Sequence, residues 1–78
     1  MNNIEKYKNI FADTFQLTEE AIESARLNVT PQWDSVGQMT LVTKIEETFN
    51  IRFDFEDILS MNSFENGKDI LKKYDVEF

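Results

Sequence analysis

The stretch WDSVGQMTLVTKIEETFN, residues 33–50, decides the fold predicted for this chain. Asp34 and Ser35 both belong to the residue types that cap helix N-termini, and Ser35-Val36-Gly37-Gln38 fits the S-x-x-Q capping box. The apolar residues that follow are spaced for one face of a helix: Leu41, Val42, Ile45 and Phe49. We therefore predict an amphipathic helix from Asp34 or Ser35 to about residue 50, with this face buried.

The segments on either side also have helical patterns. Apolar residues at steps of three and four predict an amphipathic helix over residues 3–16. The connection over residues 17–34 can form one helical turn at residues 18–22 and carries apolar residues that pin it to the core: Leu27, Val29, Pro31 and Trp33. Further on, Asp54 and Ser63 are candidate caps for a short helix over residues 55–61 and a last helix over residues 64–74.

These patterns predict an all-α fold, a small four-helix up-and-down bundle with three long helices and one short one. We place the single domain at residues 1–78 and expect residues 75–78 to form a frayed tail. Trp33 is interpreted as a lid that holds the connection against the helix. The core is predicted to contain Phe11, Phe15, Phe49, Phe53, Phe55 and Phe64.

Length and composition exclude several classes of protein. A chain of 78 residues leaves no room for a second domain. The net charge of −7 argues against a nucleic-acid partner, because such binding depends on cations that displace counterions. The absence of Cys and His removes a thiol nucleophile, an imidazole base and the usual zinc ligands, so we expect neither an enzyme nor a metal site. The sequence also lacks a signal-peptide pattern and a membrane span, and we expect a monomer in the cytoplasm.

Ser35 is the residue on which the predicted function depends, since its hydroxyl lies where a long connection meets a helix N-terminus. A phosphate ester there would lie beside unpaired backbone N–H groups and the positive end of the helix dipole. The chain offers no side chain that could activate this hydroxyl, so a separate enzyme would have to modify it. The alternative interpretation is that Ser35 only caps the helix.

Beyond these local patterns, the chain resembles the acyl carrier proteins, also called phosphopantetheine-binding carrier proteins, over nearly its whole length. The family's Asp-Ser-Leu attachment motif corresponds to Asp34-Ser35-Val36, and IEETFNI, residues 45–51, follows at the family's spacing. The segment DFEDI, residues 54–58, matches the acidic turn of the family's third helix. Ser63-Phe64 matches the start of its fourth helix.

The resemblance implies that Ser35 receives a 4'-phosphopantetheine group from coenzyme A through a Mg2+-dependent phosphopantetheinyl transferase, with Asp34 beside it in the attachment motif. Acyl groups would then be carried as thioesters on the terminal thiol. It also implies a partner-binding surface made of two exposed apolar residues and an acidic rim: Val36, Met39, Glu46, Glu47 and Glu56. The expected partners are acyl- or aminoacyl-loading ligases and acyltransferases or synthases with basic docking surfaces.

Three positions depart from the pattern of many fatty-acid carriers. Those proteins have acids where this chain has Gly37 and Thr40, and a small residue where it has Lys44. We therefore predict a carrier for a specialised polyketide, secondary-metabolite or polysaccharide-modification pathway rather than for housekeeping fatty-acid synthesis. One alternative is an aminoacyl carrier of the D-alanyl or peptide-synthetase type. An alternative of another class is an unmodified helical interaction module, in which Val36 and Met39 bind a partner helix.

Overall fold

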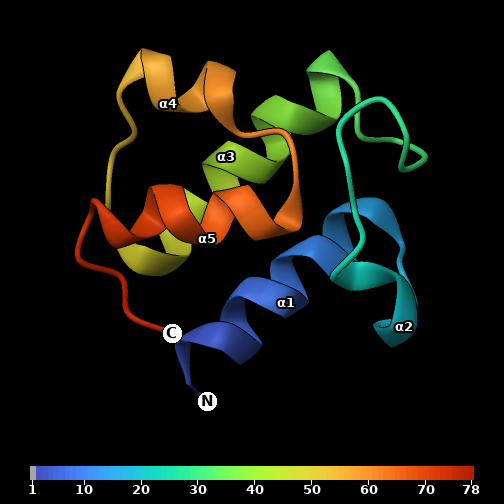
Figure 1. Ribbon diagram of the computed structural model, residues 1–78, viewed down its shortest axis with the longest axis horizontal. Helices are drawn as coiled ribbons and strands as arrows, with labels where there is room; N and C mark the ends of the chain where they lie inside the picture. The colour runs from blue at the N-terminus through green and yellow to red at the C-terminus, as the bar shows by residue number, and fades with distance from the viewer. Residues whose placement is uncertain (1) are drawn as a thin grey trace.

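The computed structural model describes residues 2–78, which form five helices joined by non-helical connections (Figure 1). Their bounds are α1 (Asn3–Phe15), α2 (Glu19–Ile22), α3 (Ser35–Phe49), α4 (Phe55–Ser60) and α5 (Phe64–Lys72). Met1, with which the predicted domain begins, lies outside the described residues. The predicted all-α class is confirmed, and the helical turn expected at residues 18–22 corresponds to α2.

Helices α1 and α3 form the most extensive helix–helix contact in the described part of the chain. Leu41, Val42 and Ile45 of α3 are at most 2% exposed, as their spacing predicts, and Phe49 is partly buried beside them. Helix α1 contributes its aromatic face to the same core: Tyr7, Phe11 and Phe15. Both helices therefore bury the faces that their hydrophobic periodicity defines.

Trp33 is fully buried at the end of the long connection, which confirms its predicted position as a lid on the core. Its ring stacks on that of Phe15, with centroids 5.1 Å apart, and meets Phe11 edge to face at 5.4 Å. Aromatic pairs of this kind add to the free energy gained by burial alone. The backbone immediately before Ser35 is consequently fixed against α1.

Backbone hydrogen bonds pin the same connection to the junction between α4 and α5. Leu27 N donates to Asn62 O at 2.9 Å, and Phe64 N donates to Ala25 O at 3.1 Å. The expectation that the connection is pinned is confirmed for Leu27 and Trp33, which are partly and fully buried. Val29 is 74% exposed, because it lies at the tip of the loop beyond these contacts.

The prediction that Phe55 belongs to the core is wrong, since its side chain is 72% exposed. Helix α4 turns Asp57 inward, where the carboxylate meets Lys73 Nζ and the Tyr74 hydroxyl at 2.5 Å each. Residues two positions before and after Asp57 lie about 200° around the helix and face solvent. Phe55 and Leu59 are these residues, and both are largely exposed.

The contact between Asp57 and Lys73 is expected to make the stability of the protein sensitive to acid. The hydrogen bond from Lys73, followed by that from Tyr74, holds the pKa of Asp57 below its ordinary value of 3.8. A carboxylate with a lowered folded-state pKa contributes stability that is complete above its unfolded-state pKa and is lost as the pH falls through the folded-state pKa. Asp57→Asn should therefore lower the urea midpoint at neutral pH and reduce its decline below about pH 4.

Asp69→Asn provides the matched control for this experiment. Asp69 makes an exposed ion pair with Lys72 at 3.8 Å, within one helix, and pairs of this kind contribute little to stability. Its urea midpoints should follow those of the wild type at every pH. If Asp57→Asn keeps the wild-type pH profile as well, the proposed acid sensitivity of the α4–α5 contact is wrong.

Residues 75–78, for which the sequence predicts a frayed tail, make several contacts with the rest of the chain. Val76 is 5% exposed, and the Phe78 ring lies 5.3 Å from that of Tyr7. Asn3 Nδ2 donates to Glu77 O at 2.9 Å. These contacts bring the two ends of the described chain together (Figure 1), at the opposite end of α1 from the connection that leads to Ser35.

Candidate functional site

Ser35 is the first residue of α3, and its side chain is exposed. Asp34 is the N-cap, with its carboxylate accepting a hydrogen bond from Gly37 N at 2.9 Å. The Ser35 hydroxyl has no hydrogen-bond partner among residues 2–78. The structure thus assigns capping to Asp34 and leaves the serine oxygen accessible at the start of a 15-residue helix.

The predicted capping box at Ser35 is wrong, because Gln38 has other partners. Its side chain is only 8% exposed and accepts a hydrogen bond from Trp33 Nε1 at 2.6 Å. Its amide group donates to Ile58 O at 2.7 Å and to Met61 O at 3.0 Å. Gln38 therefore joins the connection, the first turn of α3 and the end of α4, a function that its polar character alone does not reveal.

Gly37 marks a close approach between the connection and α3. A Cβ atom built on Gly37 would overlap the carbonyl oxygen of Gln32 and would lie 3.1 Å from Phe15 Cε1. Gln32 itself has a φ of 73°, in the left-handed region. The absence of an acid at position 37 therefore has a packing explanation, and this position no longer supports the prediction of a specialised pathway.

Most of the exposed large apolar side chains belong to the segments that Gln38 and Trp33 connect. Among the large hydrophobic residues described as exposed, all but Phe78 belong to the connection, α3 or α4, and we call them the apolar rim: Val29, Val36, Met39, Phe55 and Leu59. Val36 and Met39 are 77% and 53% exposed, which confirms that both side chains are at the surface. The sequence reasoning missed Val29, Phe55 and Leu59, although the four-residue spacing of the last two was a signal that they share one face of α4.

The three glutamates of the predicted acidic rim differ in their surroundings. Glu47 is exposed and lines an open hollow on α3 together with Val36 and Met39. Glu56 is exposed on α4. Glu46 is half-buried, and its carboxylate accepts a hydrogen bond from Phe53 N at 2.9 Å. Glu46 therefore holds the connection between α3 and α4, whereas Glu47 and Glu56 remain available to a partner.

Three comparisons with known proteins found no relative of this chain. Neither a family model, nor a curated protein, nor a solved structure matches the chain. Within residues 2–78, no helix combines the length and apolar character needed to cross a bilayer. The geometry around Ser35 is therefore the main structural indication of function.

Proposed function

We propose that this chain is a carrier protein of the acyl carrier type, which holds acyl intermediates as thioesters on a 4'-phosphopantetheine arm attached to Ser35. The observation that supports this proposal most directly is the exposed Ser35 hydroxyl at the first position of α3, which Asp34 relieves of any capping function. On this proposal α1, α3, α4 and α5 correspond to the four helices of the carrier bundle, and α2 is a turn within the first connection.

The chemistry of attachment fits the start of α3. A bond forms between Ser35 Oγ and the phosphorus of the pantetheine phosphate, the phosphate bond to 3',5'-ADP breaks, and the transferase removes the hydroxyl proton. The product is a phosphodiester anion, which the first-turn N–H groups and the helix dipole favour. The chain supplies the nucleophile and the electrostatic setting, while the base and Mg2+ belong to the transferase.

The apolar rim and the nearby acids suit brief docking of partner enzymes. Val36, Met39, Phe55 and Leu59 provide apolar contact area, and Glu47 and Glu56 provide negative charge on the same two helices. Complementary charge speeds encounter more than it tightens a complex, which suits a shuttle that must leave each enzyme. The proposed partners are a phosphopantetheinyl transferase, a loading ligase, and acyltransferases or synthases with basic docking surfaces.

A specialised pathway is a further part of the proposal, and it now depends on Thr40 and Lys44. Thr40 is exposed on α3 and Lys44 is half-buried one turn further along. Both residues line an open hollow on α3, whereas a Cβ atom at Gly37 would overlap the backbone. Their identities are therefore the part of the sequence pattern that still supports a specialised pathway.

The proposal predicts that the apo protein gains the mass of one phosphopantetheinyl group when it is incubated with coenzyme A, Mg2+ and a broad-specificity phosphopantetheinyl transferase. Intact-mass spectrometry measures the gain. Ser35→Ala should abolish it completely, because the acceptor oxygen is removed. Ser24→Ala, which removes another exposed serine hydroxyl, should be modified as fully as the wild type.

The same experiment separates the alternative functions. An unmodified wild type, or a gain that persists in Ser35→Ala, would contradict the carrier proposal and favour a helical interaction module. If the holo protein forms, incubation with amino acids, ATP and adenylating enzymes tests the aminoacyl alternative, again through intact mass. An aminoacyl adduct on the arm would change the proposed cargo but not the proposed attachment site.

A further inference from the structure

The charge of the chain is distributed unevenly around Ser35. The whole chain has 15 acidic and 8 basic residues, but residues 24–45 contain one acid, Asp34, and two basic residues, Arg26 and Lys44. The carboxylate of Asp34 is engaged in capping α3. The segment that presents Ser35 is therefore close to neutral, whereas the rest of the chain is strongly acidic.

The exposed face of α3 beyond Ser35 carries no charge before Lys44. One open hollow on this face is lined by residues of α3: Val36, Met39, Thr40, Thr43, Lys44 and Glu47. The hydroxyl groups of Thr40 and Thr43 donate to carbonyl groups of the same helix at 3.3 and 2.9 Å, so neither hydroxyl hydrogen is available to a partner. Because Lys44 lies two i,i+4 steps beyond Val36, the first charge that a partner meets along this row is positive.

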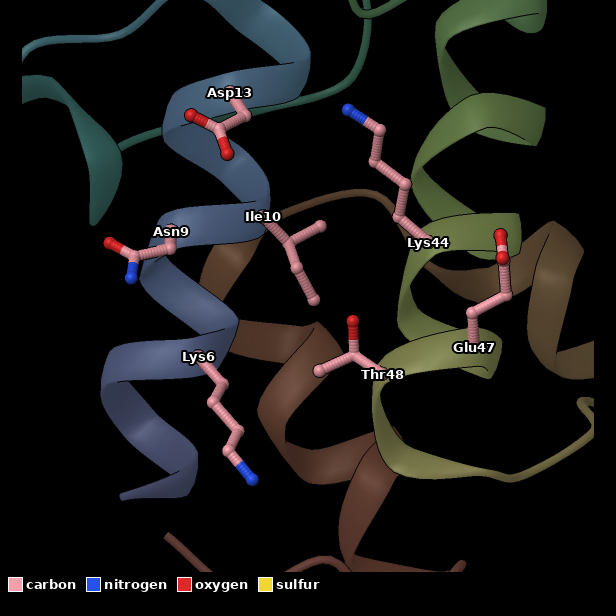
Figure 2. Close-up of a pocket in the computed structure, with 7 residues that line it drawn as sticks. All are labelled: Lys6, Asn9, Ile10, Asp13, Lys44, Glu47 and Thr48. Atoms are coloured by element: carbon pink, nitrogen blue, oxygen red, sulfur yellow. The ribbon is translucent and has the colours of Figure 1, made fainter. Parts of the chain in front are cut away.

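Lys44 makes no ion pair that would neutralise its charge. Four other lysines are each paired with a carboxylate: Lys8, Lys68, Lys72 and Lys73. Asp13 and Glu47 line a groove between α1 and α3 together with Lys44, but neither is paired with it among the described residues. Figure 2 shows the Lys44 amine directed toward the N-terminal end of α3 and the Glu47 carboxylate on the side of α3 away from α1. The two charges are therefore separately available to a partner.

The distance of Lys44 from Ser35 places it at the edge of a docking contact. The two residues are nine positions apart, or about 14 Å along the helix. A standard interface covers about 800 Å2 on each partner, which is a patch of roughly 16 Å radius. An enzyme centred on Ser35 would therefore reach Lys44 at its margin, where a charge acts mainly on the rate of association.

We propose that Lys44 is a specificity-determining residue, which pairs with an acidic side chain on the docking surface of the loading enzyme and disfavours enzymes whose docking surface is basic throughout. This inference rests on the proposed function and refines the charge expected of its partners. Basic groups of the partner meet Glu47 and Glu56, and an acidic group meets Lys44. Since like charges in a contact cost affinity, a single lysine attracts the matching enzyme and rejects others.

Charge reversal at Lys44 tests this proposal with a broad-specificity phosphopantetheinyl transferase whose docking surface is basic. At low ionic strength, Lys44→Glu should raise the initial rate of mass gain about fivefold, because one exposed repulsive pair becomes an attractive one. Lys44→Gln should give an intermediate rate, and both increases should disappear in high salt. Lys72→Glu changes the net charge by the same amount on α5 and should leave the rate close to that of the wild type.

Charge reversal on the enzyme tests the acidic partner group. Basic residues of the transferase docking surface are replaced by Glu one at a time, and one such variant should modify the wild-type carrier faster than Lys44→Glu. Lys44→Gln carries the test if the new acid lowers the Tm of the carrier.

Two results would overturn the inference while leaving the carrier function intact. One is an equal rate for the wild type and both Lys44 variants at low ionic strength, or an equal increase in Lys72→Glu. The other is the absence of any transferase variant that reverses the preference. A failure of the wild type to gain mass at all would instead contradict the proposed function.

Discussion

Gln38→Met is expected to lower the free energy of unfolding by about 3 kcal/mol, which corresponds to a fall in Tm of roughly 15 °C for a domain of this size. Methionine has nearly the same shape, so the core keeps its volume. Three polar groups nevertheless lose their partner: Trp33 Nε1, Ile58 O and Met61 O. Each buried group left without a partner costs about 1–3 kcal/mol. Urea unfolding followed by circular dichroism measures the change.

The fully buried Trp33 reports on the same junction. It is the single tryptophan of the chain, so its fluorescence is not mixed with that of another indole. Loss of the Gln38 bond should change its emission in the folded state and reduce the hydrogen-exchange protection of α4. Gln16→Met removes an exposed hydrogen bond to Asp13 O and should leave stability within about 0.5 kcal/mol of the wild type. A comparably small loss in Gln38→Met would mean that the Gln38 junction does not hold α4.

The helices could be predicted from the sequence where the signals are local. The period of apolar residues defines α1 and α3, and it needs no knowledge of distant contacts. The N-terminus of α5 is equally local, because Ser63 and Asn66 cap each other's backbone within one turn. At the start of α3, either Asp34 or Ser35 could have been the N-cap residue. The structure shows that Asp34 accepts the capping hydrogen bond.

The residues whose surroundings were predicted wrongly share a different property. Contacts with residues far along the chain determine whether each of them is buried or exposed. Gln38 is buried because its amide meets carbonyl groups 20 and 23 residues later. Phe55 is exposed because Asp57 meets Lys73, 16 residues away, which fixes how α4 faces the core. A six-residue helix contains too few positions for its periodicity to reveal such a choice.

The candidate site is therefore predictable in part. The position of Ser35 follows from the capping residues Asp34-Ser35 and from the amphipathic pattern after them, and the structure places the residue at the first turn of α3. The full set of residues in the apolar rim could not be predicted from the sequence. They come from three segments whose positions depend on long-range hydrogen bonds. The half-buried position of Glu46 could not be predicted from its charge either, because it depends on the hydrogen bond that its carboxylate accepts from Phe53 N.

Gly37→Ala is expected to destabilise the protein by about 2 kcal/mol and, if the proposed function holds, to slow phosphopantetheine transfer to Ser35. The new methyl group would overlap the carbonyl oxygen of Gln32, a backbone atom that cannot rotate away as a side chain can. Overpacking of this kind costs about 1–3 kcal/mol, or more where backbone must move. The gain of about 1 kcal/mol in helix propensity offsets part of that cost. Urea unfolding and the initial rate of mass gain measure the two effects.

The position of the clash explains why transfer should slow as well. Gln32 lies two residues before the Asp34 cap, and the intervening Trp33 is fixed in the core, so the backbone can yield only by moving the segment that presents Ser35. Thr48→Ala introduces alanine at an exposed position of α3, where no backbone overlap arises, and should change neither stability nor transfer rate appreciably. If Gly37→Ala is as stable as the wild type, the contact between position 37 and the Gln32 carbonyl oxygen is not tightly packed. The position could then hold an acid, and glycine there would again point to specialised partners rather than to packing.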